Sequence, residues 1–164
     1  MARINNGQKQ CIHIIRRKMW GDDRKAYEDI LTNYYGAESC KDLSVAEASD
    51  FIDRLKTIQE GKPMPPIHRG RLWASDAQIR KIDALVTLLG WDEEKRLNGF
   101  IKRQTKRNKT KLMLTGGEAT KVLIGLQRIA AKGDNELYNW LNSASGADIT
   151  KRYHTMTNTY VESD

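Results

Sequence analysis

Two short stretches of the sequence match each other, Leu43-Ser44-Val45-Ala46-Glu47-Ala48 and, 71 residues later, Leu114-Thr115-Gly116-Gly117-Glu118-Ala119. In both versions a hydroxyl residue is followed three positions later by Glu, which is the pattern of a helix capping box. There the hydroxyl accepts a hydrogen bond from an amide of the first helical turn, and the carboxylate accepts one from the amide of the capping residue. A third such pair lies between the two stretches. The expected capping pairs, which also mark three helix starts, are Ser44 with Glu47, Ser75 with Gln78 and Thr115 with Glu118.

Apolar residues recur every three or four positions after each stretch and again before it, which is the period of a helix with one buried face. The same 71-residue offset places Trp20 on Trp91 and Ile30 on Ile101. A large apolar residue just before a helix commonly packs as a hydrophobic staple, so we expect both tryptophans in the core. These patterns predict an all-α fold of two pseudo-repeated three-helix units. The expected helices cover residues 6–19, 22–35 and 44–60, then 75–89, 92–105 and 115–131.

The three prolines all lie between the two halves, in residues 61–74, which predicts an extended connector. After the second unit, Asp134 follows a glycine and precedes Leu137, Trp140 and Leu141, which predicts a short helix. The residues beyond it are rich in Ser, Thr, Gly and Asn, show little apolar periodicity and favour a polar tail. The expected divisions of the chain are 1–60, 61–74, 75–131, 132–143 and 144–164.

The composition is typical of a small soluble protein. A chain of 164 residues holds one ordinary domain or two very small ones, and 39% hydrophobic residues suffice for a core. No stretch approaches the roughly 18 uninterrupted apolar residues of a membrane helix, and the N-terminus lacks the apolar run of a signal peptide. Cys11 and Cys40 are too few for a disulfide framework. We therefore expect a cytoplasmic protein without a membrane partner.

The net charge of +7 is concentrated in the middle of the chain. Residues 63–112 contain 12 Lys and Arg against 5 Asp and Glu, so this segment alone accounts for the whole excess. Within it, residues 102–111 hold six positive charges and no acid. Such a segment favours an anionic partner, the alternative being a solvated loop. The predicted nucleic-acid-binding residues are Lys102, Arg103, Lys106, Arg107, Lys109, Lys111, Arg69, Arg71, Arg80 and Lys81.

The sequence predicts neither a catalytic site nor a metal site. The three histidines are scattered, and Cys11 and His13, two residues apart on an expected helix, point to different sides. Cys40 lacks the local signature of a nucleophile and fits a core position. Glu47 and Glu118 could be mistaken for a paired acid and base, but their spacing from the hydroxyl residues makes capping the better interpretation. We therefore expect no enzymatic activity and no cofactor.

Three strings carry a resemblance to a known family through their order and spacing: Ser39-Cys40-Lys41-Asp42-Leu43-Ser44, Ala74-Ser75-Asp76-Ala77-Gln78-Ile79-Arg80-Lys81-Ile82 and Phe100-Ile101-Lys102-Arg103-Gln104-Thr105. They resemble the GemA family of Mu-type phage and prophage regulatory proteins, over about residues 8–131. The family tends to place a glycine after the last string, where this chain has Lys106. The resemblance implies an early-region regulator of host or phage gene expression in a bacterial host cell. It implies no catalytic residues.

Two functions are compatible with these features. The first is DNA association of weak sequence preference through the basic loop 102–111, because its charges suit backbone phosphates. A helix-turn-helix is disfavoured, because its helices are joined by roughly 3–4 residues, whereas the expected second and third helices are about eight residues apart in each half. The alternative is a non-enzymatic adaptor that binds a host DNA-topology or transcription protein through its helical faces.

Overall fold

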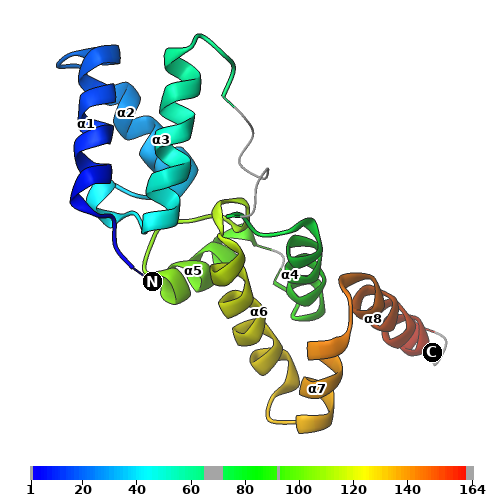
Figure 1. Ribbon diagram of the computed structural model, residues 1–164. Helices are drawn as coiled ribbons and strands as arrows, with labels where there is room; N and C mark the ends of the chain where they lie inside the picture. The colour runs from blue at the N-terminus through cyan, green and yellow to red at the C-terminus, as the bar shows by residue number, and fades with distance from the viewer. Residues whose placement is uncertain (1, 65–71, 92, 162–164) are drawn as a thin grey trace. The chain divides into compact units, whose positions relative to one another are not determined.

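The computed structural model describes residues 2–64, 72–91 and 93–161 (Figure 1). Across these residues the regular structure consists of helices, among them eight α-helices, and contains no strand, which confirms the predicted all-α class. The chain divides into two compact units, Met1–Trp73 and Ala74–Asp164. Each unit has a hydrophobic core of its own and is described by itself.

The first unit packs its helices around one aromatic-rich core. α1 (Asn6–Trp20) lies against α3 (Val45–Gln59), and α2 (Lys25–Ile30) continues directly into a π-helical turn, Leu31–Tyr35. Gly36 ends this turn with a φ of 58°, a left-handed conformation that glycine adopts without strain. The largest fully buried side chains of the unit are Ile12, Leu31, Tyr35, Leu43, Phe51 and Leu55.

The second unit is built around α6, since three other helices of this unit pack against it. Its helices are α4 (Asp76–Leu88), α5 (Glu94–Thr105), α6 (Gly116–Ala131), α7 (Asn135–Ser143) and α8 (Gly146–Val161). α4, α5 and α7 contact α6, whereas α8 packs along α4. The largest fully buried side chains of the unit are Ile82, Leu85, Ile101, Leu114, Leu126 and Leu141.

Each of the three expected capping pairs forms a capping box. The amide of Ser44 donates to the Glu47 carboxylate over 2.9 Å, and the amide of Thr115 donates to the Glu118 carboxylate over the same distance. The return bonds, from the glutamate amides to the hydroxyl oxygens, measure 3.3 Å in both boxes. Glu47 and Glu118 therefore act as capping residues that set the starts of α3 and α6.

A glutamine joins two helices in the same way in each half of the expected repeat: α1 to α3 in the first half, and α4 to α6 in the second. The side-chain amide of Gln8 donates to the Val45 carbonyl in the first turn of α3 over 2.9 Å, and that of Gln78 donates to the Gly116 carbonyl in the first turn of α6 over 3.0 Å. Each amide also donates to the hydroxyl four residues further along that helix, over 2.9 and 3.1 Å. The full pseudo-repeat stays a prediction that superposing the two halves tests, and different helix directions would contradict it.

The expected connector, residues 61–74, lies partly outside the described residues, because these omit 65–71. Its C-terminal end is packed. Trp73 is 4% exposed in the core of the first unit, and Ala74 is 6% exposed in the core of the second. The boundary between the two compact units falls between these two residues.

The C-terminal segment differs from the polar tail expected for residues 144–164. Residues 146–161 form α8. Ser145 caps it, since its hydroxyl oxygen accepts from the Asp148 amide over 3.3 Å, and the Asp148 carboxylate in turn accepts from the Ser145 amide over 3.0 Å. Ile149 is 0% exposed in the core of the second unit. The prediction of a tail is therefore wrong for residues 146–161. Ile149, Tyr153, Met156 and Tyr160 recur at spacings of four, three and four residues, the period of a helix with one apolar face, although polar residues dominate the segment.

Gly146 permits that close contact between α8 and α4. A Cβ built on Gly146 would lie 2.8 Å from the backbone oxygen of Arg80 and 3.0 Å from the backbone nitrogen of Lys81. Because backbone atoms of a packed helix cannot move aside as a flexible side chain can, α8 can approach α4 this closely only through a glycine.

Candidate nucleic-acid interface

Three cations of the predicted basic loop are exposed at the end of α5. The apolar face of α5 packs on α6, which leaves Lys102, Arg103 and Lys106 facing the solvent. The guanidinium carbon of Arg103 lies 5.8 Å from the ring centre of Phe100, within the range of a cation–π interaction. No carboxylate among the described residues forms an ion pair with these three side chains. We call Lys102, Arg103 and Lys106 the α5 cluster.

Lys106 ends α5 in an unusual backbone conformation. Its φ is 63°, in the left-handed region, and its amide donates to the Lys102 carbonyl over 2.8 Å. Glycine adopts this conformation freely, whereas for a residue with a Cβ it lowers the stability of the fold by about 1–2 kcal/mol. The left-handed backbone gives a physical reason for the glycine that the family resemblance leads one to expect here. In this chain the position instead adds a positive charge to the α5 cluster.

Replacing Lys106 by Gly is expected to raise the free energy of unfolding by about 0.5–1 kcal/mol. The gain is the relief of left-handed strain, reduced by the larger backbone entropy that glycine loses on folding. Urea unfolding followed by circular dichroism measures it. Lys132→Gly should behave likewise, because Lys132 ends α6 with a φ of 49°. A less stable Lys106→Gly protein would contradict this account and indicate a stabilising contact of the lysine side chain.

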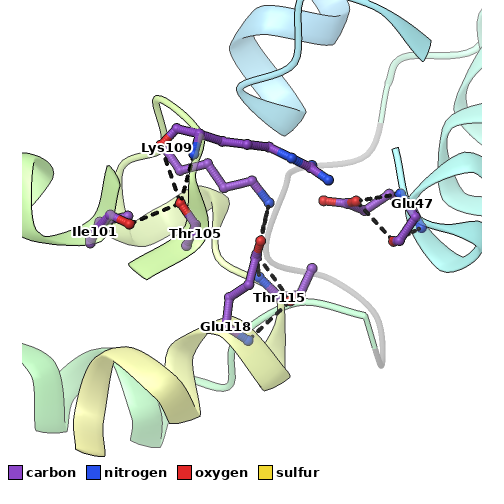
Figure 2. A network of polar contacts seen from close by, with 8 residues as sticks. Glu47, Ile101, Thr105, Lys109, Thr115 and Glu118 are labelled. Carbon is purple, nitrogen blue, oxygen red and sulfur yellow. Dashed lines mark hydrogen bonds and ion pairs between the residues drawn. The ribbon is translucent and has the colours of Figure 1, made fainter. Parts of the chain in front are cut away.

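Lys109, the fifth cation of the loop, is buried in an ion pair. Its side chain is 0% exposed, and its ammonium group donates to the two carboxylate oxygens of Glu118 over 3.0 and 2.8 Å (Figure 2). Nearby, the Thr105 hydroxyl lies 2.9 Å from the Ile101 carbonyl and accepts from the Arg107 amide over 3.3 Å. These bonds fold the basic loop back onto the start of α6. Lys109 therefore does not face a phosphate partner, and the prediction that it does is wrong.

Lys111, the last cation of the loop, forms an ion pair with Asp83 of α4. Both side chains are partly exposed, at 34% and 47%. Arg107 is half-buried. The charge count along residues 102–111 therefore overstates the charge at the surface, because the two neutralising carboxylates, nine residues after Lys109 and 28 residues before Lys111, lie outside that stretch. Of the six loop cations, the three of the α5 cluster keep the exposed position that phosphate binding requires.

The remaining predicted cations have different positions. Arg80 is exposed on α4. The neighbouring Lys81 is half-buried, donates to the Asn142 carbonyl over 2.9 Å, and has its pKa lowered by burial. Lys81 thus joins α4 to the end of α7. Arg69 and Arg71 lie outside the described residues.

Sequence reasoning missed a groove that α8 forms with α4. It has a volume of about 880 Å³ and is lined by residues of α4, α6 and α8, including Arg80, Lys81 and Lys151. Lys151 is not among the predicted binding residues, because the sequence pattern predicts a polar tail for that segment. The spacing of Ser145 and Asp148, a hydroxyl residue and an acid three positions apart, was the local signal for that helix start.

A buried polar cluster in the first unit was also missed. The Tyr35 hydroxyl and the Arg54 Nε both donate to one Asp50 carboxylate oxygen, each over 2.7 Å. Arg54 is 2% exposed and its guanidinium carbon lies 5.8 Å from the ring centre of Trp73. Burial, with the Asp50 charge beside it, raises the pKa of Tyr35. The cluster fixes α3 to the π-helical turn, and its signal in the sequence was the four-residue spacing of Asp50 and Arg54 on a helix.

Among the described residues, no three His, Cys, Asp or Glu side chains gather closely enough to hold a metal ion. No helix within the same residues is long and apolar enough to cross a membrane.

One comparison with known proteins gives a match. A family model described as Bacteriophage Mu, GemA protein matches residues 22–132, about two thirds of the chain. The chain belongs to this family. Neither a curated protein nor a solved structure matches it significantly. The GemA match begins after α1 and ends after α6, so it includes the α5 cluster and the Lys109–Glu118 pair, whereas α8 lies beyond it.

Proposed function

We propose that this GemA-family protein is a non-enzymatic phage-type regulator that associates with duplex DNA in the cytoplasm of the bacterial host through the α5 cluster. The supporting observation is a contrast within one loop. Lys109 and Lys111 are neutralised by carboxylates of their own unit, whereas the α5 cluster is exposed and has no ion-pair partner among the described residues. Exposed cations that the fold leaves unneutralised are the groups through which proteins bind backbone phosphates.

The size of the α5 cluster sets the expected salt dependence of binding. Each phosphate contact releases condensed counterions and contributes about −0.9 to the slope of log affinity against log salt concentration. Three contacts therefore give a slope of about −3, whereas six from the whole loop would have given about −5. Phosphate contacts carry little sequence information, so the affinity should vary little between duplexes of different sequence.

Replacing Lys102, Arg103 and Lys106 together by Gln is expected to weaken duplex binding for all sequences and to flatten the salt slope by up to about 3. Fluorescence anisotropy of a labelled duplex, titrated at several salt concentrations, measures both effects. A matched control replaces three exposed lysines elsewhere, Lys41, Lys56 and Lys121, by Gln, which removes the same charge.

The comparison of these two proteins decides the proposal. We expect the control protein to keep the parent slope. Equal losses of duplex affinity in the two triple variants would mean that binding depends on net charge alone. A parent protein that binds no duplex at low salt would overturn the proposal and leave the adaptor function, in which a host protein is the partner, as the better account.

A further inference from the structure

The groove between α4 and α8 is a second basic surface, separate from the α5 cluster. Its volume of about 880 Å³ falls within the roughly 300–1,000 Å³ of clefts that bind ligands. Arg80 and Lys81 line it from α4, and Lys151 lines it from α8. None of the three residues of the α5 cluster lines it. Cations from two helices distant in sequence therefore lie along one cleft.

The positive charge of the groove is not cancelled by its own carboxylate. Among the described residues that line it, Asp83 is the acidic one, and Asp83 pairs with Lys111. Arg80 and Lys151 are exposed. Lys81 uses one N–H on the Asn142 carbonyl, and an ammonium group has two further N–H groups to donate.

The same groove also has a small apolar lining. Ala77 and Ala84 contribute to it from α4, Ala147 from α8, and Leu123 from α6. Short side chains at these positions leave room for apolar groups of a partner. A surface that combines cations with apolar contacts suits a ligand carrying carboxylates and apolar side chains on one segment.

We propose that the groove between α4 and α8 binds an acidic peptide segment of a partner protein. Carboxylates of the segment pair with Arg80, Lys81 and Lys151, and its apolar side chains pack against the alanines and Leu123. Duplex DNA fits less well, because its sugar-phosphate backbone offers no apolar side chains that could pack against this lining. The protein thus has two anion-binding surfaces of different shape, one for phosphates and one for a peptide.

The test selects peptides of 13 residues, the number in α4, from a random displayed library on the full chain, immobilised through its N-terminus. We expect the enriched peptides to combine two or more Asp or Glu with apolar residues. Arg80→Glu with Lys151→Glu should weaken the binding of a synthetic copy of the best peptide by about tenfold or more, since two attractions become repulsions. Both residues are exposed, so the variant should keep the parent's thermal unfolding curve.

Two further variants test whether the peptide binds in the groove itself and not through the net charge of the protein. Arg17→Glu with Lys56→Glu makes the same charge change at exposed positions of the first unit and should leave peptide binding unchanged. Ala77→Trp places a large side chain in the groove without changing any charge, so it should abolish peptide binding. The variant should still fold, because Ala77 is exposed. The proposal is overturned if no acidic motif is enriched, or if the Arg80→Glu, Lys151→Glu protein binds the peptide as the parent does. It is also overturned if this double substitution weakens the binding of a short DNA duplex and of no peptide.

Discussion

Glu118→Gln is expected to lower the free energy of unfolding by about 3–5 kcal/mol, the usual cost of removing one partner from a buried ion pair. Gln keeps the capping function, since it also accepts from the amide of Thr115. What changes is the charge of the Glu118 side chain opposite Lys109, whose side chain is 0% exposed. Urea unfolding of the full chain, followed by circular dichroism, gives the loss.

A second substitution distinguishes the ion pair from the cap. Lys109→Met in the Glu118→Gln protein removes the buried ammonium and keeps a side chain of similar length, so we expect it to recover much of the lost stability. Thr115→Ala, which removes the cap hydroxyl and leaves the pair intact, should cost only about 0.5–2 kcal/mol. If Glu118→Gln costs no more than Thr115→Ala, the pair contributes little and the description of Lys109 as an internal tie of the loop fails.

Gly146→Val is expected to detach or displace α8, with a cost of about 1–3 kcal/mol in the free energy of unfolding. Even the first added carbon would lie 2.8 Å from the Arg80 oxygen, and the branched side chain of Val adds more volume at the same place. Ile149, which is 0% exposed, would lose its packing as the helix moves away. Amide hydrogen exchange in residues 146–155 measures the loss directly, because protection there depends on the helix being docked.

Gly99→Ala is the matched control for Gly146→Val. Gly99 lies inside α5, and a Cβ built on it has no atom within 4 Å. Alanine there should stabilise the protein by about 0.5–1 kcal/mol, because it lowers the entropy that the helix loses on folding. Unchanged protection of residues 146–155 in Gly146→Val would mean that α4 and α8 approach each other less closely than the structure has them.

The parts of the fold that could be predicted from the sequence are those with local causes. Ser44, Ser75 and Thr115 start helices because their partners stand three residues away on the same chain segment. Ser145 and Asp148 start α8 by the same kind of local contact, whereas its close approach to α4 depends on the backbone opposite Gly146, which is distant in sequence. The caps are local properties, whereas that contact is a tertiary one.

The candidate site shows the same division. The positive charge of residues 102–111 is visible in the sequence, but its distribution between surface and interior is not. Lys109 is buried because Glu118 stands at the start of the next helix, and Lys111 is paired because Asp83 faces it from α4. A capping glutamate gives no sign in the sequence that it also binds a lysine. Which cations stay exposed is decided by the packing of α4, α5 and α6.

The packing of α8 along α4 also has a consequence for the order in which the chain can fold during synthesis. Proteins are made from the N-terminus, and domains generally fold as units as they emerge. The first unit is complete once Trp73 has been made, so it can fold while the rest is still being translated. The second unit has to wait for almost its whole length, because α8, which packs along α4, is made after the other helices of this unit. Until then Ile149 has not docked, and the face of α4 that α8 covers is open to chaperones or to any other nascent chain nearby.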